Sequence, residues 1–428
     1  MLRLESKQSP DVTRALWIPT IWMLYIASKP LGTWFQLSSA DPDIGSPLDR
    51  AFLIVLLCVA LWILIRRRFD WFSAIKENTF LVVLIVFMLV SILWSNIPGI
   101  SFKRWLRELQ AIFMAFVVLS EPSPRQAMES ILRKTTYILI PFSLLLIKYF
   151  PAYGRMYSRW SGGVQWIGVA LQKNGLGRLC LISLFYLFWS LVRRWQGNNA
   201  PVWKYQTHVE IFLMFITVLL MGGPGRNLFY AATMMYALGV GLLVYCGFHL
   251  AKKFGIALRA GILMTIVALI IIFGMVTIFT GASNMGFIAS SAGRDATLTD
   301  RTEVWAALLP LAMQRPIIGS GYGGFWTARK VEMFIVNEAH SGYLDELLAL
   351  GFVGILLASL FYLSSCRNAQ RILYYDFDWG TLWICYLIMV VVHNLTESSI
   401  HTFTNQLTAV ILFFSVSYTS LLSRRQKS

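Results

Sequence analysis

The stretch AGILMTIVALIIIFGMVTIFTG, residues 260–281, decides the class of fold. An apolar run of about 20 residues crosses a bilayer as one helix, because a helix satisfies its own backbone hydrogen bonds. Similar runs recur along the chain, and we expect about twelve transmembrane helices, near residues 14–28, 48–66, 78–95, 102–119, 131–149, 173–193, 206–221, 226–248, 257–281, 342–364, 379–395 and 401–422. The sequence therefore predicts an all-α polytopic membrane protein, with a single membrane domain over residues 1–428.

The composition supports this class and excludes others. Hydrophobic residues make up 57% of the chain, and the mean hydropathy is +0.62, far above soluble norms. A net charge of +16 would suit a nucleic-acid partner, but the charges are scattered over loops rather than gathered in one soluble domain. The polar start of the chain does not resemble a cleavable signal peptide. All five cysteines fall in or beside apolar segments, and we interpret them as core residues.

Basic residues also predict the orientation in the membrane. Clusters of them fall in alternate loops, at Arg66–Arg68, Arg133 and Lys134, Arg193 and Arg194, Lys252 and Lys253, Arg367 and Arg371, and Arg424 and Arg425. Loops rich in lysine and arginine stay in the cytoplasm. Both termini are therefore expected inside, and the long loop over residues 281–341 outside.

The loop over residues 281–341 is the one long insertion, and long loops in compact proteins are usually functional or disordered. A capping box that begins at Asp300 predicts a helix, which Pro316 ends. The glycines of 319–324 predict a turn, and 325–337 predicts a second amphipathic helix. Two short helices lying on the outer membrane surface would cover a cavity.

His340 lies where this loop meets the apolar span over residues 342–364. The unperturbed pKa of histidine is near neutral, so His340 could act as a general base. A helix-capping histidine is the alternative interpretation, and Glu338, Glu397 and His393 are the other candidate bases. The same loop carries the cations Arg294, Arg301, Arg315, Arg329 and Lys330. Fixed cations beside a base predict chemistry on an anionic, lipid-borne substrate.

Other cations extend this prediction. Arg301 opens the first loop helix, where it could grip phosphate oxygens with its planar fork or simply pair with a nearby acid. Arg226 follows a Gly-Pro-Gly turn and starts a helix whose positive end would face an anion, although a plain tight turn is the alternative. Lys173 and Asn174 place a cation and an amide at the outer mouth of another helix.

A metal site is the alternative to these cations. His340, His393 and His401 are all expected near the outer face. Their spacing matches no metal-binding pattern, and the nearby cations would repel a metal ion. No P-loop, dinucleotide fingerprint or HExxH motif occurs. We therefore predict neither a metal nor another cofactor.

The chain resembles the O-antigen ligase and polysaccharide polymerase family of bacterial envelopes. No single motif is specific, but their order along the chain matches. The matching pieces are Lys173-Asn174-Gly175, Arg226-Asn227, Arg301 to Trp305, Pro316 to Gly323, Ala339 to Leu344, and Gly351 to Gly354. Two departures are Ser341, where the family usually has asparagine, and the Gly-Pro-Gly lead into Arg226, where a serine is more usual.

The resemblance implies a metal-independent, inverting glycosyltransferase in the bacterial inner membrane, with its site facing the periplasm. It implies an undecaprenyl diphosphate-linked glycan as donor and either a lipid-linked glycan or lipid A–core as acceptor. His340 would be the base, Arg226 and Arg301 would stabilise the diphosphate, and the predicted substrate-binding set also holds Lys173, Asn174, Tyr322 and Tyr343. An exopolysaccharide or O-antigen polymerase is favoured, an O-antigen ligase is the alternative, and a solute transporter is the competing class. Polysaccharide-assembly proteins are possible partners, as is the lipid bilayer itself.

Overall fold

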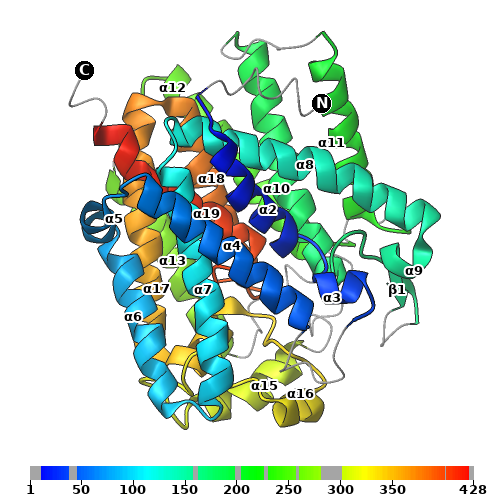
Figure 1. Ribbon diagram of the computed structural model, residues 1–428, viewed down its shortest axis with the longest axis vertical. Coiled ribbons are helices and arrows are strands. Elements are labelled where there is room, and N and C mark those ends of the chain that lie inside the picture. Colours follow the sequence, from blue (N-terminus) through cyan, green and yellow to red (C-terminus); the bar gives the residue numbers. More distant parts are fainter. Residues whose placement is uncertain are drawn as a thin grey trace. The chain divides into compact units, whose positions relative to one another are not determined.

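The computed structural model describes residues 11–37, 46–157, 162–197, 204–225, 230–256, 260–280, 301–400 and 402–423. Within these ranges the chain is almost entirely helical (Figure 1). Its contacts divide it into two compact units. Unit 1 comprises residues 1–70, 113–239 and 405–428, and unit 2 comprises residues 71–112 and 240–404.

Unit 1 contains most of the N-terminal helices. Its elements are η1 (Arg14–Leu16), α2 (Trp17–Ile26), α3 (Leu31–Trp34), α4 (Pro47–Arg66), α8 (Pro124–Tyr149), α9 (Pro151–Gly154), β1 (Arg155–Tyr157), β2 (Val164–Trp166), α10 (Lys173–Trp195), α11 (Gln206–Gly222) and α19 (Gln406–Ser423). The helices α7 (Pro98–Leu119) and α12 (Ala232–Lys253) contribute residues to both units.

Unit 2 contains the long loop and the helices around it. Its elements are α5 (Trp71–Glu77), α6 (Thr79–Ser91), η2 (Ile92–Trp94), α13 (Ala260–Phe279), α15 (Arg301–Ala312), α16 (Ala328–Phe334), α17 (Gly342–Tyr375) and α18 (Phe377–His393). The helix α17 packs against α6, α13, α15 and α18, so it forms the centre of this unit.

A helix occurs at each of the twelve positions expected from the apolar runs. Six of the described helices are long and apolar enough to cross a membrane, or seven if the bent pair α5 and α6 is one span. The all-α membrane class is therefore confirmed. That all twelve cross the bilayer, and that the long loop is periplasmic, stay predictions.

One feature departs from the all-α prediction. The strands β1 and β2 pair antiparallel, with Arg155 opposite Trp166 and Tyr157 opposite Val164. The apolar periods that predict helices do not extend into this short segment, so nothing in the sequence analysis indicated a hairpin.

In its described part, residues 301–341, the long loop forms two helices, as expected. The first, α15, begins at Arg301; Asp300, Arg294 and the rest of 281–300 lie outside the described residues. The second, α16, is shorter than predicted. The hydroxyl of Thr327 accepts from the backbone of Lys330 at its start, and Ile335 ends it in the left-handed conformation, with φ 57°.

The helix α17 is broken at Gly351, where φ is 66° and ψ is −162°. A Cβ at Gly351 would lie 2.4 Å from the carbonyl oxygen of Ile317, so the position requires glycine. The break frees two backbone donors. Phe352 donates to Pro316 (2.8 Å) and Val353 donates to Ile317 (3.1 Å), while Ser320 donates to Leu348 (3.0 Å). The loop thus satisfies the backbone groups that a continuous helix would have paired internally.

Candidate functional site

His340 is the last residue but one before α17, and its backbone is held in the left-handed region with φ 51°. Non-glycine residues seldom adopt this conformation. It costs about 1 kcal/mol or more and persists only where the surrounding structure imposes it. Trp305 of α15 helps to impose it, because its indole Nε1 donates to the carbonyl of Ala339 at 2.7 Å.

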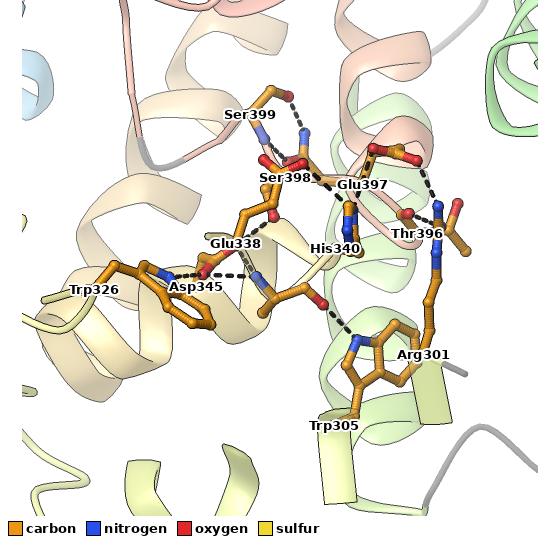
Figure 2. Close-up of polar contacts among 12 residues, drawn as sticks. Arg301, Trp305, Trp326, Glu338, His340, Asp345, Thr396, Glu397, Ser398 and Ser399 are labelled. Atoms are coloured by element: carbon orange, nitrogen blue, oxygen red, sulfur yellow. Dashed lines mark hydrogen bonds and ion pairs between the residues drawn. The ribbon is translucent and has the colours of Figure 1, made fainter. Parts of the chain in front are cut away.

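Two carboxylates face the same nitrogen of the His340 ring (Figure 2). Its Nδ1 lies 3.3 Å from Oε1 of Glu338 and 3.7 Å from Oε2 of Glu397. Glu338 precedes His340 by two residues, whereas Glu397 comes from the turn that follows α18. The fold therefore brings together two segments far apart in the sequence.

Glu397 also binds Arg301, and so joins the cation to the histidine. Its Oε1 lies 2.6 Å from Nη2 of Arg301, and Nη1 of Arg301 donates to the carbonyl of Thr396. Burial alone would raise the pKa of Glu397, but the charges of Arg301, His340 and His393 hold that pKa well below its usual range. The carboxylate is thus ionised at neutral pH.

This carboxylate changes the acid–base behaviour of His340. Burial would lower the pKa of the imidazole, but the contact with Glu397 and the charges of Glu397 and Glu338 outweigh burial and Arg301, so the pKa is raised. Because both acids lie at Nδ1, we infer that this nitrogen carries the proton of the neutral ring and that Nε2 can accept another. A base oriented by a second group is the arrangement expected for proton abstraction.

Residues 227–359 match the family model described as O-Antigen ligase. This part of the chain is therefore similar to the O-antigen ligase family. The matched region contains Arg301 and His340 but ends before Glu397. The family match alone would therefore not have revealed that Glu397 contacts both residues. Together with the apolar helices, it points to a multi-pass bacterial membrane protein.

The chain is also similar to the exopolysaccharide production protein ExoQ of Rhizobium meliloti (strain 1021). The two are 20% identical over 286 residues, which cover 64% of this chain and 61% of that protein. The chain thus spans about three fifths of the length of this relative.

Within the O-antigen ligase region, Arg301 is already partly engaged. A guanidinium has five N–H groups, and one goes to Glu397 and one to Thr396. The sequence predicted a phosphate-gripping fork; the structure adds that the same fork orients the carboxylate behind His340. The phosphate role stays a prediction for the remaining N–H groups.

Both motif tyrosines of this region are buried inside unit 2. The hydroxyl of Tyr343 donates to Val391 at 2.9 Å, and its ring packs on Gly274. The hydroxyl of Tyr322 bonds to Glu108, and burial together with that carboxylate holds its pKa well above its usual value. Their predicted contact with substrate stays a prediction.

The other predicted site residues lie in unit 1. Lys173 and Asn174 begin α10, and Nζ of Lys173 lies 5.3 Å from the ring centroid of Tyr230. Arg226 and Asn227 lie outside the described residues, as does His401. Of the predicted catalytic residues, the structure therefore brings together Arg301 and His340.

A metal ion could be considered at the same cluster. Ligand atoms of Glu338, His340 and Glu397 all lie within 4.8 Å of one another. One carboxylate of this set already carries the guanidinium of Arg301, whose charge would repel a cation. The donor set is thus geometrically able to hold a divalent ion but electrostatically better suited to a proton.

Proposed function

We propose that the protein is an inverting glycosyltransferase that uses a lipid-linked glycan. The observation that carries this proposal is the chain of contacts from Arg301 through Glu397 to His340, which prepares one ring nitrogen as a base. The donor is an undecaprenyl diphosphate-linked glycan at the periplasmic face of the inner membrane, and the acceptor is a sugar hydroxyl.

The proposed reaction is a single displacement. The acceptor oxygen attacks the anomeric carbon and forms the new glycosidic bond, while the bond from that carbon to the diphosphate oxygen breaks. The acceptor proton passes to Nε2 of His340, and the electron pair leaves with undecaprenyl diphosphate. Cations can stabilise this leaving group in place of a metal, and we assign this role to Arg226 and Arg301, with Lys173, Asn174, Tyr322 and Tyr343 as further substrate contacts.

We favour polymerase over ligase activity. Support comes from the printed name of the relative, an exopolysaccharide production protein. The family description, O-Antigen ligase, favours the second candidate, transfer to lipid A–core.

An assay with purified protein in lipid nanodiscs tests both candidates. The protein is given a lipid-linked repeat as donor, with either a second lipid-linked repeat or lipid A–core as acceptor, in buffer containing EDTA. We expect longer lipid-linked glycan with the first acceptor, and a loss of at least about a hundredfold in turnover for His340→Gln. Product only on lipid A–core would make the protein a ligase. Unchanged turnover of His340→Gln, or activity that requires added magnesium or manganese, would contradict the mechanism.

A further inference from the structure

Asp345 binds both segments that carry the His340–Glu397 pair. It is only 3% exposed and lies in the first turn of α17. Its two carboxylate oxygens accept from the backbone N–H of Ala339 at 3.1 and 3.0 Å. One oxygen also accepts from the indole Nε1 of Trp326 at 2.8 Å, and the other accepts from the hydroxyl of Ser398 (Figure 2).

The neighbours of these donors are the reacting groups. Ala339 lies between Glu338 and His340, and Ser398 directly follows Glu397. The segments around residues 339 and 398 have no regular secondary structure to fix their separation. The carboxylate of Asp345 binds one donor from each segment. It therefore sets the distance between the imidazole of His340 and the carboxylate of Glu397.

The carboxylate of Asp345 accepts from neutral donors, and the charged group on which it acts is the neighbouring Glu346. The charged groups that face His340 are Glu397, Glu338 and Arg301. Asp345 instead receives a backbone amide, an indole and a hydroxyl. Its influence on His340 is therefore chiefly geometric, whereas Glu397 acts on the imidazole by direct contact and by its charge.

We propose that Asp345 is a positioning residue that holds His340 and Glu397 in register. This inference rests on the proposed function for its catalytic consequence, but its structural core does not depend on which glycan is transferred. Loss of the carboxylate lets the segments around residues 339 and 398 separate, so that Glu397 no longer supports the protonated imidazole.

The direct test is Asp345→Asn, which keeps the size of the side chain but replaces one acceptor oxygen by an NH₂ group. The primary readout is the pKa of His340, followed by NMR of the protein labelled with ¹⁵N-histidine. The chain has only five histidines, so His340→Gln assigns the signal. We expect Asp345→Asn to lower this pKa, because the contact with Glu397 that raises it is loosened.

Turnover provides the second readout. Misplacement of a catalytic group by about 1 Å can cost on the order of a hundredfold, so we expect Asp345→Asn to lower kcat between about tenfold and a hundredfold, with KM for the donor within about twofold. The acid limb of the pH–rate profile should move to lower pH. Ser398→Ala removes one donor and should produce a smaller change in the same direction.

Glu108→Gln is the matched control. Glu108 is also a 3% exposed carboxylate of unit 2, and it accepts from the hydroxyl of Thr402 at 2.7 Å and the backbone of Phe403 at 2.5 Å. It should lower thermal stability as Asp345→Asn does but leave the His340 pKa unchanged. Equal His340 pKa values in Asp345→Asn, Ser398→Ala and wild type would overturn the inference. A lowered pKa in a protein with no transferase activity would support the positioning role while removing the proposed function.

Discussion

At the scale of single residues, the two acids beside His340 differ in how well they are shielded from water. The exposed fraction of the side chain is 2% for Glu397 and 17% for Glu338. A charge that is less screened by solvent acts more strongly on its neighbour. Glu397 is therefore the acid that chiefly sets the proton affinity of His340, and Glu338 adds to it.

We expect Glu397→Gln to shift the acid limb of the pH–rate profile to lower pH. A general base must be deprotonated, so the wild-type rate falls as pH drops through the raised pKa of His340. Without the Glu397 charge, burial and Arg301 are opposed only by Glu338, and the pKa falls. Turnover at neutral pH should still drop, roughly tenfold or more, because the ring loses its orienting partner.

Glu338→Gln is the comparison for this experiment and should move the limb less. A profile that is identical in Glu397→Gln and wild type would remove Glu397 from the proton chemistry.

The sequence suggested the candidate site residues but not the contacts between them. His340 and Arg301 could be singled out because a neutral-pH base and fixed cations lie in one long loop. The contact with Glu397 could not be predicted, since it depends on how the turn after α18 folds back onto the loop. The proposed role of Asp345 had no sequence signal, because the helix dipole favours an acid in the first turn of any helix.

At the scale of elements, the start of α17 is fitted closely to the turn that carries Glu397. The backbone N–H of Gly342 lies 3.0 Å from the carbonyls of both Asn394 and Glu397. A Cβ at Gly342 would lie 1.9 Å from Oδ1 of Asn394. That amide oxygen in turn accepts from the backbones of Ser399 and Ile400. The glycine is needed for close approach rather than for an unusual φ.

Gly342→Ala should therefore lower both stability and turnover. Overpacking of this kind costs about 1–3 kcal/mol, and the displaced turn would carry Glu397 away from His340. Gly247→Ala in α12 is the control, because no atom lies within 4 Å of its added Cβ and alanine favours a helix over glycine. Thermal unfolding and turnover of both variants test this. Equal unfolding temperatures and equal turnover of the two variants would contradict the close packing of Gly342 against Asn394.

The elements themselves were largely predictable. Apolar runs marked a helix at every expected position, because burial in lipid or protein requires such runs. The break at Gly351 was not predictable, since the apolar pattern continues through it from Leu347 to Leu357. Only the approach of Ile317 explains it, and that is a tertiary contact.

At the scale of the whole molecule, the alternation of basic clusters makes a definite prediction of orientation. Alkaline phosphatase is active only outside the cytoplasm, so a fusion after Arg329 should be active and one after Arg371 inactive. Arg329 lies in α16 and Arg371 near the end of α17. Activity of both fusions in intact cells, normalised to the amount of fusion protein, is the measurement. The opposite pattern would place His340 on the cytoplasmic side and exclude a periplasmic reaction.

The break in α17 also divides the helix into a short segment next to His340 and a longer segment that could span the bilayer. At about 1.5 Å per residue, residues 352–375 alone extend about 36 Å, enough to span the hydrocarbon core. The segment before Gly351 is therefore not needed for spanning. Hydrogen bonds to residues 316–320 hold Leu348 before the break and Phe352 and Val353 after it. When membrane thickness changes, a spanning helix adjusts its tilt. Because the loop holds residues on both sides of the break at Gly351, we expect little of this tilting to reach His340.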